Sequence, residues 1–234
     1  MKYSNLSDYH VNRLVKHHSF PWNHWDIKDF FSTDYLTYFK AILPEDLNPD
    51  LVYDKNRSAL RLTRKACVKF PFLEKIVQYF QQPSTIKFFE DKSKEGFFKD
   101  CYVRIDYTLD HPGYYLAPHL DRHSKLLTFQ VYLPESEEKW GTDIYNNRGG
   151  DMILSRTIPF IRNYGYFFFP GLDADHHRKW HGVTKEVTAD RPSIIINYMT
   201  KPEKLDVIKG DDNPSGGNVQ LAEGANEWEE WWSL

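Results

Sequence analysis

Two histidines and one aspartate in the second half of the chain have the spacing of metal ligands. His119 and Asp121 are two residues apart, directly after the strand-like segment GYYLAP. On an extended chain, residues i and i+2 project from the same face, so both side chains are expected to point to one place. A metal ion used for chemistry needs a third ligand. His181 is the best candidate, because it begins another strand-like segment, HGVTKEV.

Two histidines and one carboxylate on one face of a metal ion form the arrangement used by non-haem Fe(II) oxygenases. Three octahedral positions then stay open for the reactants. His176 and His177, in the segment DADHHRKWH, are alternative third ligands, although neither is placed as well before a strand. Their more ordinary interpretation is a solvated, basic loop at the entrance of the site.

A second His-x-Asp tripeptide, His24-Trp25-Asp26, occurs in the segment PWNHWDIKD. We expect this segment to precede a helix, where an acidic residue in the first turn is favoured by the helix dipole. The second tripeptide is therefore predicted to be structural.

The segment HGVTKEVTADRPSIIINYM predicts a strand, a turn and a returning strand. In a hairpin centred near Glu186, Arg191 is expected to lie opposite His181, with Ser193 on the same face. An arginine fork and a hydroxyl group together suit a carboxylate, which arginine binds through two parallel hydrogen bonds. The predicted metal site therefore has a predicted anion site beside it.

The elements that must position these residues follow from a change of apolar periodicity near residue 98. Before it, STDYLTYFKAILP and FPFLEKIVQYFQQP carry apolar residues at helical spacing and end at a proline, and a shorter helix is expected from Ser84. After Gly96, short β-branched and aromatic runs separated by turn residues predict eight or so strands. This pattern favours an antiparallel sandwich or jelly roll, with the helices covering one sheet.

We expect a single domain with three parts. Residues 1–98 form a helical extension packed on the core, residues 99–200 form the β core, and residues 201–234 form a C-terminal tail. The tail ends in NEWEEWWSL, and its tryptophans are expected to pack onto the domain or onto a second copy of the chain in a homo-oligomer.

Composition excludes several classes of protein. The 234 residues are 41% hydrophobic and 16% aromatic, enough for a sizeable core, so a disordered protein is excluded. The formal net charge of −3 provides no general field for nucleic acid or an anionic membrane. The mean hydropathy of −0.64 and the short apolar runs predict no transmembrane segment. A basic stretch that includes Arg57, Arg61 and Lys69 is interpreted as solvated surface.

Cysteine usage and the N-terminal residues bear on the compartment. Cys67 and Cys101 are too few for a disulfide framework and are interpreted as small buried hydrophobes. The segment MKYSNLSDYHVNRL has no apolar stretch of the signal-peptide type. A reducing, cytoplasmic location is therefore expected.

Residues 99–200 resemble the iron(II)- and 2-oxoglutarate-dependent dioxygenases, in particular their prolyl-hydroxylase-like branch. The matching elements are His119-x-Asp121, His181 in the segment WHGV, and Arg191-x-Ser193. The resemblance implies a double-stranded β-helix core, Fe(II) held by His119, Asp121 and His181, and O2 as the oxidant. It also implies that 2-oxoglutarate chelates the metal while its far carboxylate meets Arg191 and Ser193.

The resemblance extends to further cosubstrate contacts. In LTFQVYL, Tyr132 resembles a tyrosine that contacts the cosubstrate in the prolyl-hydroxylase-like branch, and Gln130 and Thr128 share its face. Tyr107, on the strand before His119, is a weaker match. The segment WGTDIY is similar to the Gly-rich turn and strand of the family, with Thr142 in place of the more usual second glycine.

The activity that the resemblance implies is hydroxylation of an unactivated C–H bond with release of succinate and CO2. A carboxylate at Asp121 favours hydroxylation over halogenation, because related halogenases carry a small residue there. Desaturation and ring closure would use the same ligands, and the substrate is a small molecule or a protein side chain. The alternatives are a jelly-roll binding module without a metal and a cupin-like metal isomerase or hydrolase, which has no need of Arg191 and Ser193.

Overall fold

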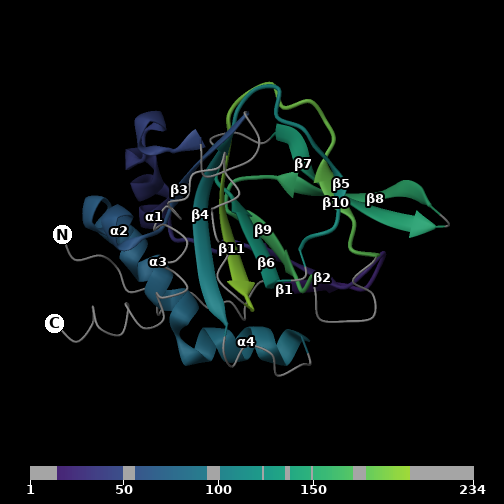
Figure 1. Cartoon of the computed structure of the whole chain (residues 1–234), viewed down its shortest axis with the longest axis horizontal. Coiled ribbons are helices and arrows are strands. Elements are labelled where there is room, and N and C mark those ends of the chain that lie inside the picture. Colours follow the sequence, from purple (N-terminus) through teal and green to yellow (C-terminus); the bar gives the residue numbers. More distant parts are fainter. Residues whose placement is uncertain are drawn as a thin grey trace, which may run out of the picture.

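Eleven strands in the described part of the chain form two antiparallel sheets (Figure 1). The structure is a computed structural model that describes residues 15–49, 56–93, 101–122, 124–134, 138–148, 150–170 and 178–200. In spatial order, the main sheet consists of β1 (Val15–His18), β2 (His24–Lys28), β9 (Tyr164–Phe168), β6 (Lys125–Tyr132), β11 (Arg191–Met199), β4 (Tyr102–Asp110) and β3 (Arg57–Arg61). The smaller sheet consists of β5 (Leu116–His119), β10 (His181–Val183), β7 (Glu138–Arg148) and β8 (Asp151–Phe160).

The two sheets pack face to face, as the predicted jelly roll requires. Side chains of both sheets meet between them in a cluster that includes Tyr132, Ile144, Ile158, Phe160 and Val183. The predicted double-stranded β-helix is therefore confirmed.

The helices cover the other face of the main sheet (Figure 1). They are α1 (Thr33–Tyr38), α2 (Arg64–Lys69), α3 (Pro71–Gln81) and α4 (Pro83–Ser93). The apolar face predicted for α3 is buried, with Leu73, Val77 and Phe80 each 0% exposed. The helix predicted to follow α3 has the same length as α3 rather than a shorter one. The predicted helix forms as α1, but its last turn, Phe39–Ala41, is a 3-10 helix.

Strand alternation decides which core each side chain enters. On β6, Leu127, Phe129 and Val131 belong to the core under the helices. Thr128 and Gln130 are also buried, and their hydrogen-bond partners lie between the two sheets. Polar groups on the inner face of β6 are therefore aimed at the interior of the β-helix.

The N-terminal part of the chain contributes strands as well as helices. β1, β2 and β3 all come from residues before 98 and occupy the two edges of the main sheet. The prediction that Asp26 lies in the first turn of a helix is wrong, because His24 and Asp26 both lie within β2, which ends before α1 begins. β2 pairs with β1 on one side and with β9 on the other, and this pairing overrides a local preference for a helix start.

Other sequence-based expectations are met in part. Cys67 is 2% exposed and both cysteines are free thiols. Within the described ranges, none of the helices is long and apolar enough to cross a bilayer. The tail of residues 201–234, with Trp228, Trp231 and Trp232, lies outside the described residues, as do His176 and His177.

Candidate metal centre and anion site

His119, Asp121 and His181 converge as predicted. The strands β5 and β10 pair antiparallel with His181 directly opposite His119, and the centroids of the two imidazole rings are 4.3 Å apart. Asp121 follows β5 by two residues. One potential ligand atom from each of the three residues lies within 4.8 Å of the others, so the three could hold one metal ion.

Both histidines present the same ring nitrogen. Nδ1 of His119 lies 3.0 Å from the Ala117 carbonyl oxygen, and Nδ1 of His181 lies 3.0 Å from the Lys179 carbonyl oxygen. A carbonyl oxygen only accepts hydrogen bonds, so Nδ1 carries the proton and Nε2 keeps its lone pair. This is the arrangement by which backbone groups orient metal-binding histidines, and it favours Nε2 as the ligand atom in both.

The residue after His181 must be glycine for the strands to approach this closely. A Cβ atom on Gly182 would lie 2.6 Å from the Leu116 carbonyl oxygen of β5. Because that contact is with backbone, a larger residue would push β10 away from β5. Gly182 therefore helps to set the separation of the two histidine ligands.

Asp121 is held by two donors in a buried setting. Lys125 Nζ donates to Asp121 Oδ1 at 2.6 Å, and Thr128 Oγ1 donates to Asp121 Oδ2 at 2.6 Å. Burial works to raise the pKa of the Asp121 carboxyl, but the charge of Lys125 and these hydrogen bonds hold it well below its usual range. The oxygen Oδ2 is 4.0 Å from His181 Nε2, so an ionised carboxylate faces the proposed metal position.

Burial also keeps the two histidines neutral. It lowers the pKa of His181 to about 4, and the nearby His119 acts in the same direction. Burial likewise lowers the pKa of His119. Near neutral pH, the cluster therefore offers two neutral imidazoles and one carboxylate, the protonation states that a metal ion requires.

Replacing Thr128 by valine is expected to weaken metal binding without unfolding the chain. Valine keeps the shape of threonine but removes the hydroxyl that orients Asp121. We expect metal affinity to fall roughly 10- to 100-fold, the usual effect of removing an outer partner of a ligand. The measurement is a titration of the metal-free protein with Fe(II) or Co(II).

A matched control is available on β8. Thr157 donates its hydroxyl to Asp143 at 2.6 Å, the same kind of bond at a carboxylate outside the cluster. Thr157→Val should leave metal affinity unchanged. Equal losses in the two variants would show that Thr128 acts through general stability rather than through Asp121.

The predicted anion site is a buried arginine at the start of β11. Arg191 is 0% exposed. Its Nε donates to the Trp140 carbonyl at 2.7 Å, one Nη donates to Asp110 at 2.6 Å and the other to Thr142 Oγ1 at 3.2 Å. A guanidinium has five N–H groups, so these three bonds leave two for a bound carboxylate.

Tyr132 and Thr142 lie beside this guanidinium. The Tyr132 hydroxyl is 2.6 Å from Thr142 Oγ1, and the guanidinium carbon of Arg191 is 5.0 Å from the centroid of the Tyr132 ring. Two hydroxyl groups and an arginine therefore converge in a buried space, which suits a carboxylate. Sequence reasoning singled out Tyr132 but assigned no contact to Thr142.

The glycine before Thr142 explains how this threonine reaches the arginine. A Cβ atom on Gly141 would lie 1.7 Å from the Ile158 carbonyl oxygen of β8, so only glycine fits there. The close approach of β7 to β8 at this position places the Trp140 carbonyl and the Thr142 hydroxyl on either side of Gly141, both within reach of Arg191.

Asp110 is a partner of Arg191 that sequence reasoning did not identify. Asp110 is 0% exposed and also accepts from Arg57 Nε, so the carboxylate is shared by two arginines. The three groups together carry a formal charge of +1, two arginines against one aspartate. The group therefore keeps a formal positive charge that attracts an anion, although Arg191 is already paired with Asp110.

The remaining predicted contacts separate into three groups. Ser193 Oγ lies 2.9 Å from Thr108 Oγ1 and accepts from Gln130 Nε2 at 2.9 Å, so Ser193 and Gln130 form one buried polar cluster. Thr128 contacts Asp121 rather than the arginine. Tyr132 lies at the arginine, as described above.

The prediction for Tyr107 is wrong. Tyr107 belongs to the core under the helices, where its ring stacks on Phe39 with centroids 5.9 Å apart. Its neighbour Thr108 contacts Ser193 between the sheets. Because successive residues of a strand face opposite sides, Tyr107 points away from the site.

The predicted hairpin between His181 and Arg191 does not form. β10 pairs with β5 and β7, whereas β11 pairs with β4 and β6. The chain between β10 and β11 therefore crosses from one sheet to the other. His181 and Arg191 face a common interior from two different sheets, rather than from neighbouring positions in one.

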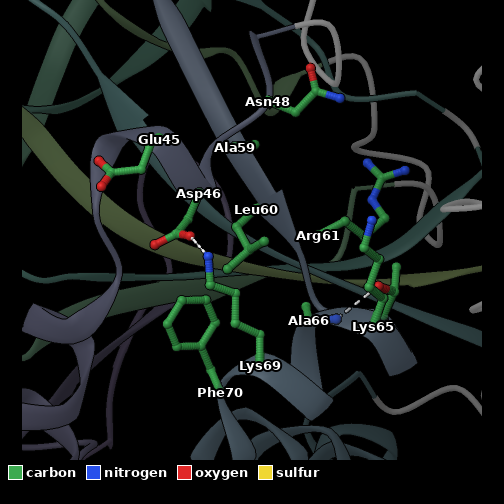
Figure 2. Close-up of a pocket in the computed structure, with 11 residues that line it drawn as sticks. Glu45, Asp46, Asn48, Ala59, Leu60, Arg61, Lys65, Ala66, Lys69 and Phe70 are labelled. Atoms are coloured by element: carbon green, nitrogen blue, oxygen red, sulfur yellow. Dashed lines mark hydrogen bonds and ion pairs between the residues drawn. The ribbon is translucent and has the colours of Figure 1, made fainter.

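The basic stretch is not simply solvated surface. Arg61 is 5% exposed and donates to Asp106 at 2.7 Å, and Arg57 pairs with Asp110. Lys65 and Lys69 are exposed, and with Arg61 they line an open cavity of about 420 Å³ between β3, α2 and the turn at Glu45 and Asp46. Figure 2 shows this cavity, with Lys69 reaching Asp46 across it.

Comparison with known proteins adds evidence on the fold. No protein-family model matches the sequence, and no curated protein matches it. A prolyl-4-hydroxylase structure from Pseudomonas putida aligns with 75% of this chain and 91% of its own, with a TM-score of 0.53 and 15% identity. The non-heme alpha-ketoglutarate-dependent carbocyclase SnoK from nogalamycin biosynthesis aligns with 82% of this chain and 84% of its own, with a TM-score of 0.50 and 13% identity. At these identities, the similarity shows a shared fold.

Proposed function

We propose that the protein is an Fe(II)- and 2-oxoglutarate-dependent oxygenase that hydroxylates an unactivated C–H bond. The observation that carries the proposal is that two sites face one interior. One is a cluster of two neutral histidines and an ionised aspartate, and the other is a buried arginine flanked by hydroxyl groups. The shared fold with a prolyl-4-hydroxylase supports the same proposal.

The residues of the first cluster fit a divalent iron ion. His119 and His181 offer Nε2 atoms whose orientation the backbone holds, and Asp121 offers Oδ2. Nitrogen and carboxylate ligands of this kind leave open positions on one face of the metal. Lys125 can keep its hydrogen bond to Asp121 while the metal is bound, because Lys125 contacts Oδ1 and the proposed ligand atom is Oδ2.

The buried site at Arg191 fits the far carboxylate of 2-oxoglutarate. Arg191 supplies a charged donor at a fully buried position, and of the Tyr132 and Thr142 hydroxyls, which bond to each other, one keeps a free proton to donate. The bonds of Arg191 to Asp110 and Trp140 fix its orientation in advance. Bound Fe(II) with 2-oxoglutarate and O2 supplies an oxidative decarboxylation that yields succinate and CO2 and oxidises a C–H bond. The protein contributes binding, orientation and exclusion of water.

The proposed reaction outcome is hydroxylation, with a small molecule or a protein side chain as substrate. Asp121 supports this choice over halogenation, because its carboxylate occupies the position that a halide would need. Ring closure remains the competing outcome, because a carbocyclase shares the fold.

A screen for succinate release tests the proposal. Protein loaded with Fe(II) is incubated with 2-oxoglutarate, O2 and candidate substrates, and we expect substrate-stimulated formation of succinate. His181→Ala should lose this activity because it removes one of three metal ligands. His111→Ala is the control, since His111 pairs with Asp190 outside the cluster.

Two results would contradict the proposal. A chain that binds neither Fe(II) nor 2-oxoglutarate would be a binding module. A chain that binds the metal but not 2-oxoglutarate would be a metal enzyme of another class, such as an isomerase or hydrolase.

A further inference from the structure

A second group of two histidines and one aspartate lies at the far edge of the main sheet. β1 and β2 pair with His18 opposite His24, and Asp26 is two residues farther along β2 on the face of His24. The rings of His18 and His24 stack with centroids 4.9 Å apart and an angle of 8° between their planes. One ligand atom from each of the three residues lies within 4.8 Å of the others.

His24 is oriented in the same way as the two histidines of the first cluster. Its Nδ1 lies 2.9 Å from the carbonyl oxygen of Trp22, the residue two positions earlier. The carbonyl accepts, so Nδ1 carries the proton and Nε2 presents its lone pair. His119 and His181 have the same contact with the residue two positions before them.

Asp26 has an oxygen atom that the surrounding side chains do not use. Its Oδ2 accepts from Tyr164 at 2.6 Å and from Arg156, and lies 3.0 Å from His18 Nε2. Its Oδ1 is buried and has no hydrogen-bond partner among the described residues. A buried carboxylate oxygen without a partner is uncommon and calls for a donor or a cation.

Arg156 places a positive charge beside His24 and Asp26 in this structure. It donates to His24 Nε2 at 3.0 Å and to Asp26 Oδ2. A guanidinium and a metal ion would compete for these two atoms. Arg156 extends from β8 and its side chain is 26% exposed, so it can turn toward solvent when a metal ion takes its place.

The group is distinct from the first cluster. Trp22 contacts His24 with ring centroids 5.0 Å apart and contacts Phe168 at 5.1 Å, and Phe168 contacts His181 at 5.0 Å. Two aromatic side chains therefore separate the two groups, and one metal ion cannot serve both.

We propose that His18, His24 and Asp26 form a second metal site, which binds a borderline divalent ion such as Zn²⁺. Two imidazoles and one carboxylate are ligands that zinc accepts, with water in the fourth tetrahedral position. Ligand distances of about 2.0 to 2.2 Å follow from this chemistry. The ion ties β1 to β2 at the edge of the main sheet and therefore stabilises the fold.

Zinc titration of the full-length His119→Ala variant isolates this site. That variant lacks a ligand of the first cluster, and we expect it to bind one equivalent of Zn²⁺ and to melt at a higher temperature when Zn²⁺ is added. Adding His24→Ala should abolish both effects. His17→Ala is the matched control, because His17 is the neighbour of His18 on β1 but faces the other side and stacks on Trp25.

Arg156→Met tests the site by a gain of binding, which a folding defect cannot imitate. Without the competing guanidinium, Zn²⁺ affinity of the His119→Ala protein should rise by about fivefold, the size expected when one partly exposed ion pair is lost. 2-Oxoglutarate should produce the same charge-transfer absorption in the anaerobic Fe(II)-loaded His24→Ala protein as in the wild type. Absence of a zinc equivalent in His119→Ala, with or without Arg156→Met, would overturn the proposal.

Discussion

Asp121→Ala is expected to abolish both metal binding at the first cluster and succinate formation. The substitution removes the anionic ligand and leaves Lys125, whose Nζ lies 2.6 Å from Asp121 Oδ1, as an unpaired positive charge beside two neutral imidazoles. Without the aspartate, the positive charge of Lys125 repels a divalent ion from this cluster. We expect Fe(II) affinity to fall by more than about 100-fold, beyond the usual loss from removing an outer partner of a ligand.

Fe(II) titration and succinate release measure this effect, and thermal unfolding checks that the variant is folded. Asp91→Ala is the control, because Asp91 pairs with Lys87 on the exposed surface of α4. Such exposed pairs contribute little, so the control should match the wild type. A folded Asp121→Ala protein with near-normal metal affinity and succinate production would show that Asp121 is not a ligand.

Arg191→Leu is expected to weaken 2-oxoglutarate binding while Fe(II) binding survives. The substitution removes a buried, charged donor, and such contacts are worth about 2 to 5 kcal/mol, which corresponds to a loss of roughly 30- to several-thousand-fold in affinity. Arg191 does not belong to the metal cluster, so Fe(II) should still bind. The charge-transfer absorption of the anaerobic Fe(II) protein, followed during titration with 2-oxoglutarate, gives the affinity directly.

Arg191→Leu also removes a partner of a buried carboxylate, so a second variant that changes no charge is needed. Leucine at position 191 leaves the buried Asp110 with Arg57 as its charged partner, so we expect the variant to lose stability as well as affinity. Tyr132→Phe changes no charge, and loss of its hydroxyl should cost about 0.5 to 1.5 kcal/mol, a few-fold in affinity. Arg64→Leu, at an exposed position of α2, is the control.

Unchanged affinity in a folded Arg191→Leu protein would place the cosubstrate carboxylate on another cation. Arg57 is the first alternative cation to test, because it shares Asp110 with Arg191. Lys125 and Arg104 are already engaged with Asp121 and Asp106. No absorption change in the wild-type protein would show that 2-oxoglutarate is not its ligand.

The metal cluster could be predicted because part of its geometry is local. His119 and Asp121 are only two residues apart, so their side chains stay close whatever the rest of the chain does, although β5 ends at His119 and Asp121 lies just beyond it. The choice of His181 depended on a strand-like segment that follows it, and the structure places that strand beside β5. The tie of each Nδ1 to a carbonyl two residues earlier is also local, but no residue type marks it.

The main errors at the site concern strand pairing and strand phase. The span from His181 to Arg191 has the length of a hairpin, yet β10 and β11 belong to different sheets. Asp26 has the character of a residue in the first turn of a helix, yet β2 is held between β1 and β9. For Tyr107, the strand was predicted but its phase was not, and a shift of one residue exchanges the two faces of a strand.

The sequence by itself determined the local periods, the end of α3 before Pro83, the chemistry of the donor atoms and the type of metal site that two histidines and an aspartate can form. The tertiary structure decided the pairing of β5 with β10, the sharing of Asp110 by Arg57 and Arg191, and the place of Thr142 beside that arginine. The physical reason is the range of the interactions. Helix and turn preferences act over a few residues, whereas strand pairing and buried charge pairs join residues far apart in the sequence, whose partners no local pattern specifies.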